Sequence, residues 1–262
     1  MSKIFPLCSS SSGNSTYIGS QYGSILIDAG TSFKNICENL AITNTSPADI
    51  KAVAITHEHT DHIKGLKTFL NRTSAKLVAS LQTAEKLIES GLVPTKTEVI
   101  IIDQNPVEIG GMSLSRFETS HDCDGSSGYT VILPDNKKIA VCTDLGIITN
   151  TVRQNLLGSD LVLLESNHDV TMLKNGPYPP QLKVRILSDK GHLSNNVCAN
   201  ELKNLLQNGT KRFILGHLSQ HNNTPLIAKA CAEASLFDIG AKNGNDYILT
   251  VAKPCNNGVT IL

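Results

Sequence analysis

Short apolar runs alternate with segments of mixed polarity along the whole chain, and this alternation predicts both strands and helices. The apolar runs predict strands at 4–7, 16–18, 24–27, 50–55, 76–79, 99–102, 107–109, 112–118, 129–133, 138–142, 161–164, 212–215, 247–251 and 259–262. Helices are predicted from Thr31 or Ser32 to about residue 40, over 63–70, from Ser80 to about 89, near 149–157, from Ser194 or Asn195 to about 207, and over 224–235. Each half begins with strands, so we expect two sheets packed face to face with helices outside.

Two segments interrupt this regular pattern. Residues 9–15 are rich in serine, glycine and asparagine, and predict a turn after the first strand. Residues 168–188 are weakly helical and are interrupted by glycine and prolines at 176–180. Neither segment has the character of a linker between independent domains, so we expect one domain over residues 1–262.

The composition narrows the class of protein. Hydrophobic residues make up 40% of the 262 residues, and the formal net charge is zero. A neutral chain argues against a strongly basic surface that coats nucleic acid, but it is compatible with a site that holds a few phosphates. No apolar run approaches the roughly 20 residues that span a bilayer, and the apolar N-terminal stretch is too short for a secretory signal. Seven scattered cysteines without a C-x-x-C pair indicate reduced thiols, mostly apolar fillers, in a cytoplasmic protein.

The segment THEHTDH, residues 56–62, carries the densest candidate chemistry in the chain. It follows an apolar strand and precedes a helix. Side chains two positions apart in an extended segment point the same way, so His57 and His59 can bind one divalent ion. Asp61 and His62 lie past the turn and can reach a second ion. Imidazole and carboxylate ligands suit Zn²⁺ or Mn²⁺, so this loop predicts part of a site for two such ions.

Single polar residues that follow other predicted strands can complete a two-metal site. His121 can complete the histidine set of the first ion, Asp144 can bridge both ions, and His217 can close the second site. His192 precedes a predicted helix, and its ordinary pKa near neutrality makes it a candidate proton donor. Helix capping or packing is the alternative role for His192.

The order of these residues resembles that of the metallo-β-lactamase superfamily. The matching pattern is His57-x-His59-x-Asp61-His62, followed by His121, Asp144 and His217. The resemblance implies an α/β fold, an αββα sandwich of two mixed sheets with helices on the outer faces and metals at one edge of the sheets. It also implies that Asp28, which is similar to that superfamily's early aspartate, supports the metal loop from behind its ligands.

Further segments resemble the YycJ (WalJ) family of bacterial proteins more closely. They lie at 11–14, 165–169, 178–179, 182–195 and 216–225, so the match runs nearly end to end. This family is linked to a DNA exonuclease activity. The resemblance therefore implies a metal-dependent phosphodiesterase that acts on DNA from a 5′ end.

For such a reaction we expect water activated between two divalent ions to attack phosphorus, with Asp61 orienting it. His192 would protonate the leaving oxygen. Glu165 could hydrogen-bond His192 and keep it protonated, or it could meet solvent as a strand-end residue. Basic residues nearby are candidate phosphate contacts, with a solvated helix face as the alternative reading: Lys183, Arg185 and Lys190.

Other functions stay open on the sequence alone. The same site could serve a phosphodiesterase for RNA or for a small molecule, and the neutral charge favours the small molecule. A metal-bearing regulatory protein is a non-enzymatic alternative, but a structural role needs only one closed four-ligand site. His168 and His221 are expected to be structural or to lie at the edge of the site.

Overall fold

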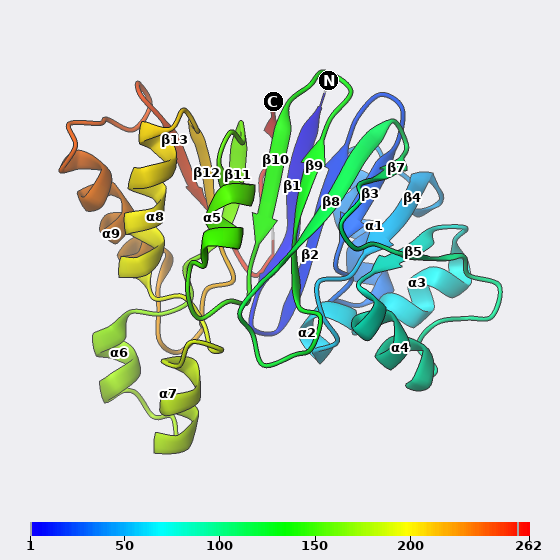
Figure 1. Ribbon diagram of the computed structural model, residues 1–262, viewed down its shortest axis with the longest axis horizontal. Coiled ribbons are helices and arrows are strands. Elements are labelled where there is room, and N and C mark those ends of the chain that lie inside the picture. The colour runs from blue at the N-terminus through cyan, green and yellow to red at the C-terminus, as the bar shows by residue number, and fades with distance from the viewer. Residues whose placement is uncertain (1, 256) are drawn as a thin grey trace.

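The computed structural model describes residues 2–255 and 257–262, and contains two seven-stranded sheets that face each other (Figure 1). The first sheet has the strand order β14 (Thr260–Ile261), β1 (Lys3–Ser10), β2 (Gly13–Gly19), β3 (Ser24–Ile27), β4 (Ile50–Ala54), β5 (Lys76–Ala79) and β6 (Val99–Ile101). The second has the order β13 (Ile248–Val251), β12 (Arg212–Gly216), β11 (Leu161–Glu165), β10 (Lys138–Cys142), β9 (Ser127–Ile132), β8 (Met112–Glu118) and β7 (Val107–Ile109). Both sheets mix parallel and antiparallel pairs.

Helices cover the outer face of each sheet, so the predicted αββα sandwich is confirmed (Figure 1). The helices that belong to the first half are α1 (Phe33–Ile42), the 3₁₀ turn η1 (Pro47–Asp49), α2 (Thr60–Ile63), α3 (Leu66–Arg72) and α4 (Leu81–Glu89). Those of the second half are α5 (Asn150–Leu156), α6 (Val170–Asn175), α7 (Pro180–Ile186), α8 (Asn195–Gln207) and α9 (Pro225–Phe237). Helices α6 and α7 lie beyond the lower edge of the second sheet in Figure 1.

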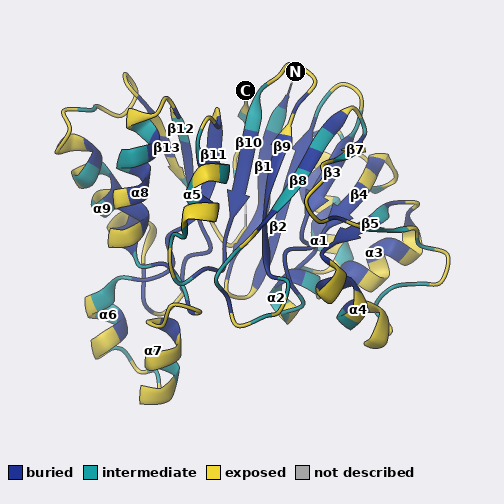
Figure 2. Ribbon diagram, in the orientation of Figure 1, coloured by how far each residue is buried: buried dark blue, intermediate teal, exposed yellow. Residues whose placement is uncertain are grey.

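Alternate residues of each strand enter different hydrophobic cores. In β3, Ile25 and Ile27 lie between the sheets, whereas Leu26 packs against the outer helices. In β11, Leu163 lies between the sheets and Val162 packs outward. Most central strands are therefore buried on both faces (Figure 2), which explains why they stand out in the sequence as nearly continuous apolar runs.

Parallel pairing brings the carboxyl ends of several strands to one edge of the sandwich. Strands β3 to β6 are parallel neighbours, and so are β10 to β13. Strand β8 runs in the direction of β10, because both are antiparallel to β9. Asp28 and the predicted metal ligands lie just past the ends of β3, β4, β8, β10 and β12, and Glu165 is the last residue of β11. Helix α2 marks this edge in Figure 1.

The serine-rich segment 9–15 differs from its prediction as a turn. Strands β1 and β2 continue to pair through Ser9 with Asn14 and Ser10 with Gly13, so only residues 11 and 12 lie outside strands. Asn14 stabilises this end of the hairpin, because its side chain accepts from the Ser10 N–H at 3.2 Å and donates to the Ser10 carbonyl oxygen at 2.9 Å. Turn-forming residues are extended here because side-chain hydrogen bonds hold the two strands together.

The helix predicted over 63–70 is also interrupted, since α2 ends at Ile63 and α3 begins at Leu66. Gly65 lies between them and donates its N–H to the Ala29 carbonyl oxygen at 2.8 Å. A Cβ atom at position 65 would overlap the Thr31 carbonyl oxygen. This close approach between two backbones, which only glycine permits, breaks the helix.

The remaining elements form close to their predicted positions, and β5 and β10 have the predicted bounds. Within the described residues, no helix is both long and apolar enough to cross a membrane. One domain over residues 1–262 and a cytoplasmic location stay predictions.

Candidate metal centre

Three imidazoles meet at the edge where β4 and β8 end. His57 Nε2 lies 3.1 Å from His59 Nδ1, and His121 Nε2 lies 3.4 Å from the same atom. A tetrahedral ion with nitrogen bonds of about 2.1 Å needs ligand atoms separated by roughly these distances. Residues from two distant loops therefore form one histidine group, as the sequence predicted.

A second group of donors lies beside the first. Asp61 Oδ2 is 3.5 Å from both His62 Nε2 and His217 Nε2. Asp144 lies between the two groups, because Oδ2 is 3.2 Å from His62 Nε2 and Oδ1 is 3.9 Å from His121 Nε2. The structure thus brings together all seven residues that the sequence predicted as ligands.

The chemistry of this donor set fits divalent cations. Its members are imidazole nitrogens and carboxylate oxygens, which suit a borderline divalent ion. Asp144 Oδ2 is buried and faces His62 Nε2 at 3.2 Å without a hydrogen bond of regular geometry, so a cation could serve as its partner. Burial raises the pKa of Asp61, but hydrogen bonds from His217 and His62 outweigh burial and hold that pKa well below its usual range.

The ring nitrogens that point away from these groups have partners of their own. Such partners fix the tautomer and the orientation of a histidine ligand. The pairs are His57 Nδ1 with Thr56 Oγ1 at 3.0 Å, His62 Nδ1 with Asp28 Oδ2 at 2.8 Å, His121 Nδ1 with the Gly191 carbonyl oxygen at 3.2 Å, and His217 Nδ1 with Glu165 Oε1 at 2.8 Å.

Asp28 lies behind the metal loop, where the resemblance places it. Its Oδ1 accepts from the Thr56 backbone N–H at 2.8 Å, and its Oδ2 faces His62. Burial raises the pKa of Asp28 above its ordinary value, although His62 partly offsets this effect. For His62, burial lowers the pKa, but the carboxylates of Asp144 and Asp28 raise it well above the ordinary value.

Three site residues have backbone conformations that L-residues adopt rarely. The φ angles are 64° at Asp28, 59° at Asp144 and 54° at His217, all in the left-handed region. Each residue directly follows a strand or lies two positions past its end. Strained backbone of this kind concentrates at functional sites, where the surrounding structure holds it in place.

Glu165 joins two of the histidines. Its Oε1 lies 2.8 Å from His192 Nδ1 and 2.8 Å from His217 Nδ1, and it is fully buried rather than facing solvent. Burial raises the pKa of Glu165, but the two histidines lower it to about 2. For His192, burial lowers the pKa, but the Glu165 carboxylate outweighs burial and raises that pKa above its ordinary value. His192 Nδ1 also lies 3.6 Å from Asp144 Oδ1.

The three predicted phosphate contacts have different surroundings. Arg185 binds the Asp122 carboxylate through Nε at 2.6 Å, and Asp122 Oδ1 lies 3.3 Å from His121 Nε2. Lys183 donates to the Lys174 carbonyl oxygen at 2.7 Å, within the α6–α7 pair. Lys190 is exposed in the loop after α7. Arg185 is therefore linked to the predicted ligand His121 through Asp122.

The other two histidines lie outside these donor groups. His168 is 1% exposed, and neither ring nitrogen has a hydrogen-bond partner within the described residues. Burial lowers the pKa of His168 to about 4, so this ring is neutral near pH 7. His221 packs edge-to-face against Tyr178, with ring centroids 5.7 Å apart.

Sequence reasoning missed several residues that contact the donor groups, among them Asp122, whose Oδ1 lies near His121 as described above, Asn14 and Cys123. Asn14 Nδ2 lies 3.2 Å from Asp61 Oδ2 and 3.1 Å from His62 Nε2, although residue 14 stood within a predicted turn. Cys123 was treated as one of the apolar fillers, but its Sγ lies 3.2 Å from His59 Nε2. Its position two residues after His121 was the signal available in the sequence.

Comparison with known proteins agrees with this architecture. The Beta-lactamase superfamily domain matches residues 24–218. Exodeoxyribonuclease WalJ of Streptococcus pneumoniae is 37% identical over 225 residues, which cover 85% of this chain and 83% of that protein. Exodeoxyribonuclease YycJ of Bacillus anthracis is 33% identical over 244 residues, which cover 92% of this chain and 91% of that protein.

A solved structure supports the fold assignment. The metallo-β-lactamase fold protein YhfI from Bacillus subtilis superposes with a TM-score of 0.74 over all of both chains, at 15% sequence identity. This likeness concerns the fold alone, whereas the two relatives above share sequence over most of their length. The chain belongs to the β-lactamase superfamily and, within it, to the family of which WalJ and YycJ are members.

Proposed function

We propose that this protein is a metal-dependent exonuclease that hydrolyses phosphodiester bonds of DNA from a 5′ end. The observation that carries the proposal is the convergence of imidazoles and carboxylates from four loops on one edge, with Asp144 between two donor groups. Relatives at 33% and 37% identity are named exodeoxyribonucleases, which supports DNA as the substrate.

Two divalent ions, Zn²⁺ or Mn²⁺, fit the two donor groups. The first group would hold an ion through His57, His59 and His121, and the second through Asp61, His62 and His217, with Asp144 shared. Such ions supply activation of water near neutral pH and neutralise charge on the phosphate.

The protein's own side chains would orient the reactants and move the proton. Asp61 is 24% exposed at its side chain and can accept a hydrogen bond from the attacking water. Glu165 raises the pKa of His192, and the His192 side chain is 20% exposed beside Asp144, so His192 could donate a proton to the leaving oxygen. Arg185 would contact a phosphate by exchanging its Asp122 partner, and Lys183 and Lys190 are weaker candidates for the same role.

A small-molecule phosphodiesterase is the second candidate, favoured by the zero net charge of the chain. The discriminating experiment compares hydrolysis of 5′-labelled duplex DNA, RNA and cyclic dinucleotides by Mn²⁺-loaded protein. We expect the 5′ label to leave DNA in small fragments from the start of the reaction, because cleavage begins at the labelled end. Activity confined to cyclic dinucleotides, or to RNA, would overturn the proposed substrate.

Variants separate the roles within the site. His192→Ala should retain metal content but lose activity on DNA by about 10²–10⁴-fold, which is the usual contribution of a general acid. Asp61→Ala should lower both metal content and activity. His221→Ala, outside both donor groups, is the matched control and should behave as wild type.

A further inference from the structure

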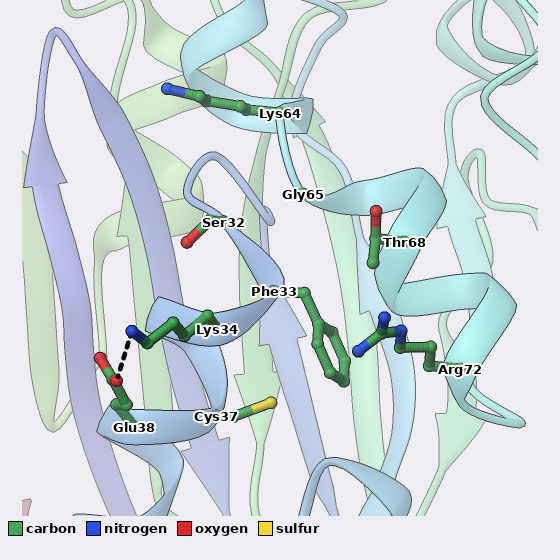
Figure 3. A pocket seen from close by; sticks show the side chains of 9 residues that line it. All are labelled: Ser32, Phe33, Lys34, Cys37, Glu38, Lys64, Gly65, Thr68 and Arg72. Carbon is green, nitrogen blue, oxygen red and sulfur yellow. Dashed lines mark ion pairs between the residues drawn. The ribbon is translucent and has the colours of Figure 1, made fainter.

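A cavity of about 590 Å³ lies on the outer face of the first sheet, between α1 and α3 (Figure 3). Cavities of roughly 300–1,000 Å³ hold ligands of the size of a nucleotide or a drug. Its lining consists of Ser32, Phe33, Lys34, Cys37, Glu38, Lys64, Gly65, Thr68 and Arg72. The proposed catalytic residues are not among them, so this cavity is separate from the metal centre.

The cavity is nevertheless joined to the metal centre through the backbone. The chain reaches Ser32 four residues after Asp28, and Lys64 two residues after His62. The two segments are hydrogen-bonded together, since the Ala29 N–H donates to the His62 carbonyl oxygen and the Gly65 N–H donates to the Ala29 carbonyl oxygen, both at 2.8 Å. Two of the segments that line the cavity therefore begin within four residues of Asp28 and His62 in the metal centre.

The lining combines an aromatic ring with cations. The Arg72 guanidinium carbon lies 5.1 Å from the centroid of the Phe33 ring, and the two side chains lie against each other in Figure 3. Lys34 and Lys64 add two exposed ammonium groups, of which Lys34 pairs with Glu38 at 3.8 Å. Stacked aromatic and guanidinium groups bind nucleobases, and ammonium groups bind phosphates.

We propose that this cavity binds one nucleotide of the DNA strand outside the cleaved linkage, with the base against Phe33 and Arg72 and a phosphate at Lys64. The proposal rests on the proposed nuclease function, which supplies a strand at the neighbouring metal centre. It adds a binding site that holds the strand between successive cleavages. Single strands bind proteins through this combination of stacking surfaces and cations.

Arg72→Glu and Lys67→Glu form a matched pair for the test. Both residues are exposed on α3 and both changes alter the net charge equally, but Lys67 does not line the cavity. The probe is a labelled single strand of about ten nucleotides with phosphorothioate linkages, bound to the metal-loaded protein and followed by fluorescence anisotropy. We expect Arg72→Glu to weaken binding about tenfold and Lys67→Glu about twofold or less.

Two further binding measurements, with an abasic strand and with free dAMP, identify what binds in the cavity. A strand with abasic sites should bind the wild type as weakly as the normal strand binds Arg72→Glu, because it lacks bases to stack. Equal effects of the two substitutions, or binding that ignores abasic sites, would refute the cavity as a nucleotide site. Tight binding of free dAMP that depends on Arg72 and leaves strand affinity unchanged would refute the strand as occupant.

Failure of this inference can be told from failure of the nuclease function. Cleavage of a normal DNA strand by the wild type measures the function, whereas the comparison of Arg72→Glu with Lys67→Glu measures the cavity. Circular dichroism melting of both variants checks that each is folded, which is expected because both side chains are exposed.

Discussion

Glu165→Gln is the substitution that tests the organisation of the site most directly. One carboxylate serves four N–H groups, because Oε1 faces His192 and His217, both at 2.8 Å, and Oε2 accepts from the Leu145 and Leu193 backbones at 3.1 and 3.2 Å. Glutamine has one oxygen and one NH₂ group in their place. If the NH₂ group faces Leu145 and Leu193, two buried backbone N–H groups lose their acceptor. If it faces the histidines, each ring must carry its proton on Nε2 to accept from it, which removes His217 Nε2 as a metal ligand.

The cost of this change follows from the number of lost acceptors. A buried donor left unpaired costs about 1–3 kcal/mol, so two of them cost about 2–6 kcal/mol. A domain has a total stability of roughly 5–15 kcal/mol, so the loss is a large part of it. His217 also loses the carboxylate that, with Asp144 and Asp61, raises its pKa to about 10 and fixes its ring, and removing such a partner weakens metal binding about 10–100-fold.

Urea unfolding of the metal-free protein measures the first effect, and competition with a chromophoric zinc chelator measures the second. Glu201→Gln is the matched control, because Glu201 is also buried, at 3% exposure, pairs with Arg153 at 3.0 Å and belongs to none of the donor groups. We expect both variants to lose stability but only Glu165→Gln to lose metal affinity. A Glu165→Gln protein with wild-type stability and wild-type metal affinity would refute the reasoning.

Three further predictions concern residues around the donor groups. Asp28→Asn should weaken metal binding about 10–100-fold, measured by chelator competition, because the amide no longer holds His62 as a carboxylate does; unchanged affinity would contradict it. Co²⁺-loaded protein should show no sulfur-to-cobalt charge-transfer band. His59 contributes Nδ1 to the first donor group, whereas the Cys123 thiol faces Nε2 of the same ring. A band that disappears in Cys123→Ser would instead make Cys123 a ligand. Burial lowers the pKa of His168 to about 4, below the ordinary 6.5. Between these pH values the unfolded chain binds more protons than the folded protein. The free energy of unfolding should therefore fall by up to about 3 kcal/mol as the pH drops from 6.5 to 4. His168→Gln should remove that fall in urea unfolding series, and an identical pH dependence would count against it.

Local patterns were enough to predict the metal loop and most elements. Strand β5, over Lys76–Ala79, has its predicted bounds because it is apolar and is buried within the sheet. The loop of His57 to His62 combines a strand end with a dense set of donors, so its chemistry is visible without tertiary information. His121, Asp144 and His217 could be found by one physical rule, that parallel strands end at one edge.

The misplaced features depend on contacts between distant parts of the chain. Gly65 interrupts a helix because another backbone passes close to it, which no local pattern reports. The Asp122 partner of Arg185 lies 63 positions away in the chain, so the sequence could not report this ion pair, and the phosphate contact of Arg185 stays a prediction. Asn14 and Cys123 became visible as site residues only when β2 and the loop after β8 were placed beside α2.

Asp28 and His217, whose φ angles are positive, help to explain how the edge that carries the donor groups is held together. Asp28 and His217 cost about 1–3 kcal/mol each in backbone strain, yet both are buried and fixed by hydrogen bonds that cross between segments. Asp28 accepts from Thr56, and the His217 N–H donates to Ser9 Oγ at 2.8 Å. These bonds join the first strands of the chain to its last donor loop, so folding of the sandwich itself sets the position of the donors. Substitutions at such supporting residues should therefore change metal affinity without touching a ligand, which is why Glu165 and Asp28 test the site more sharply than the histidines do.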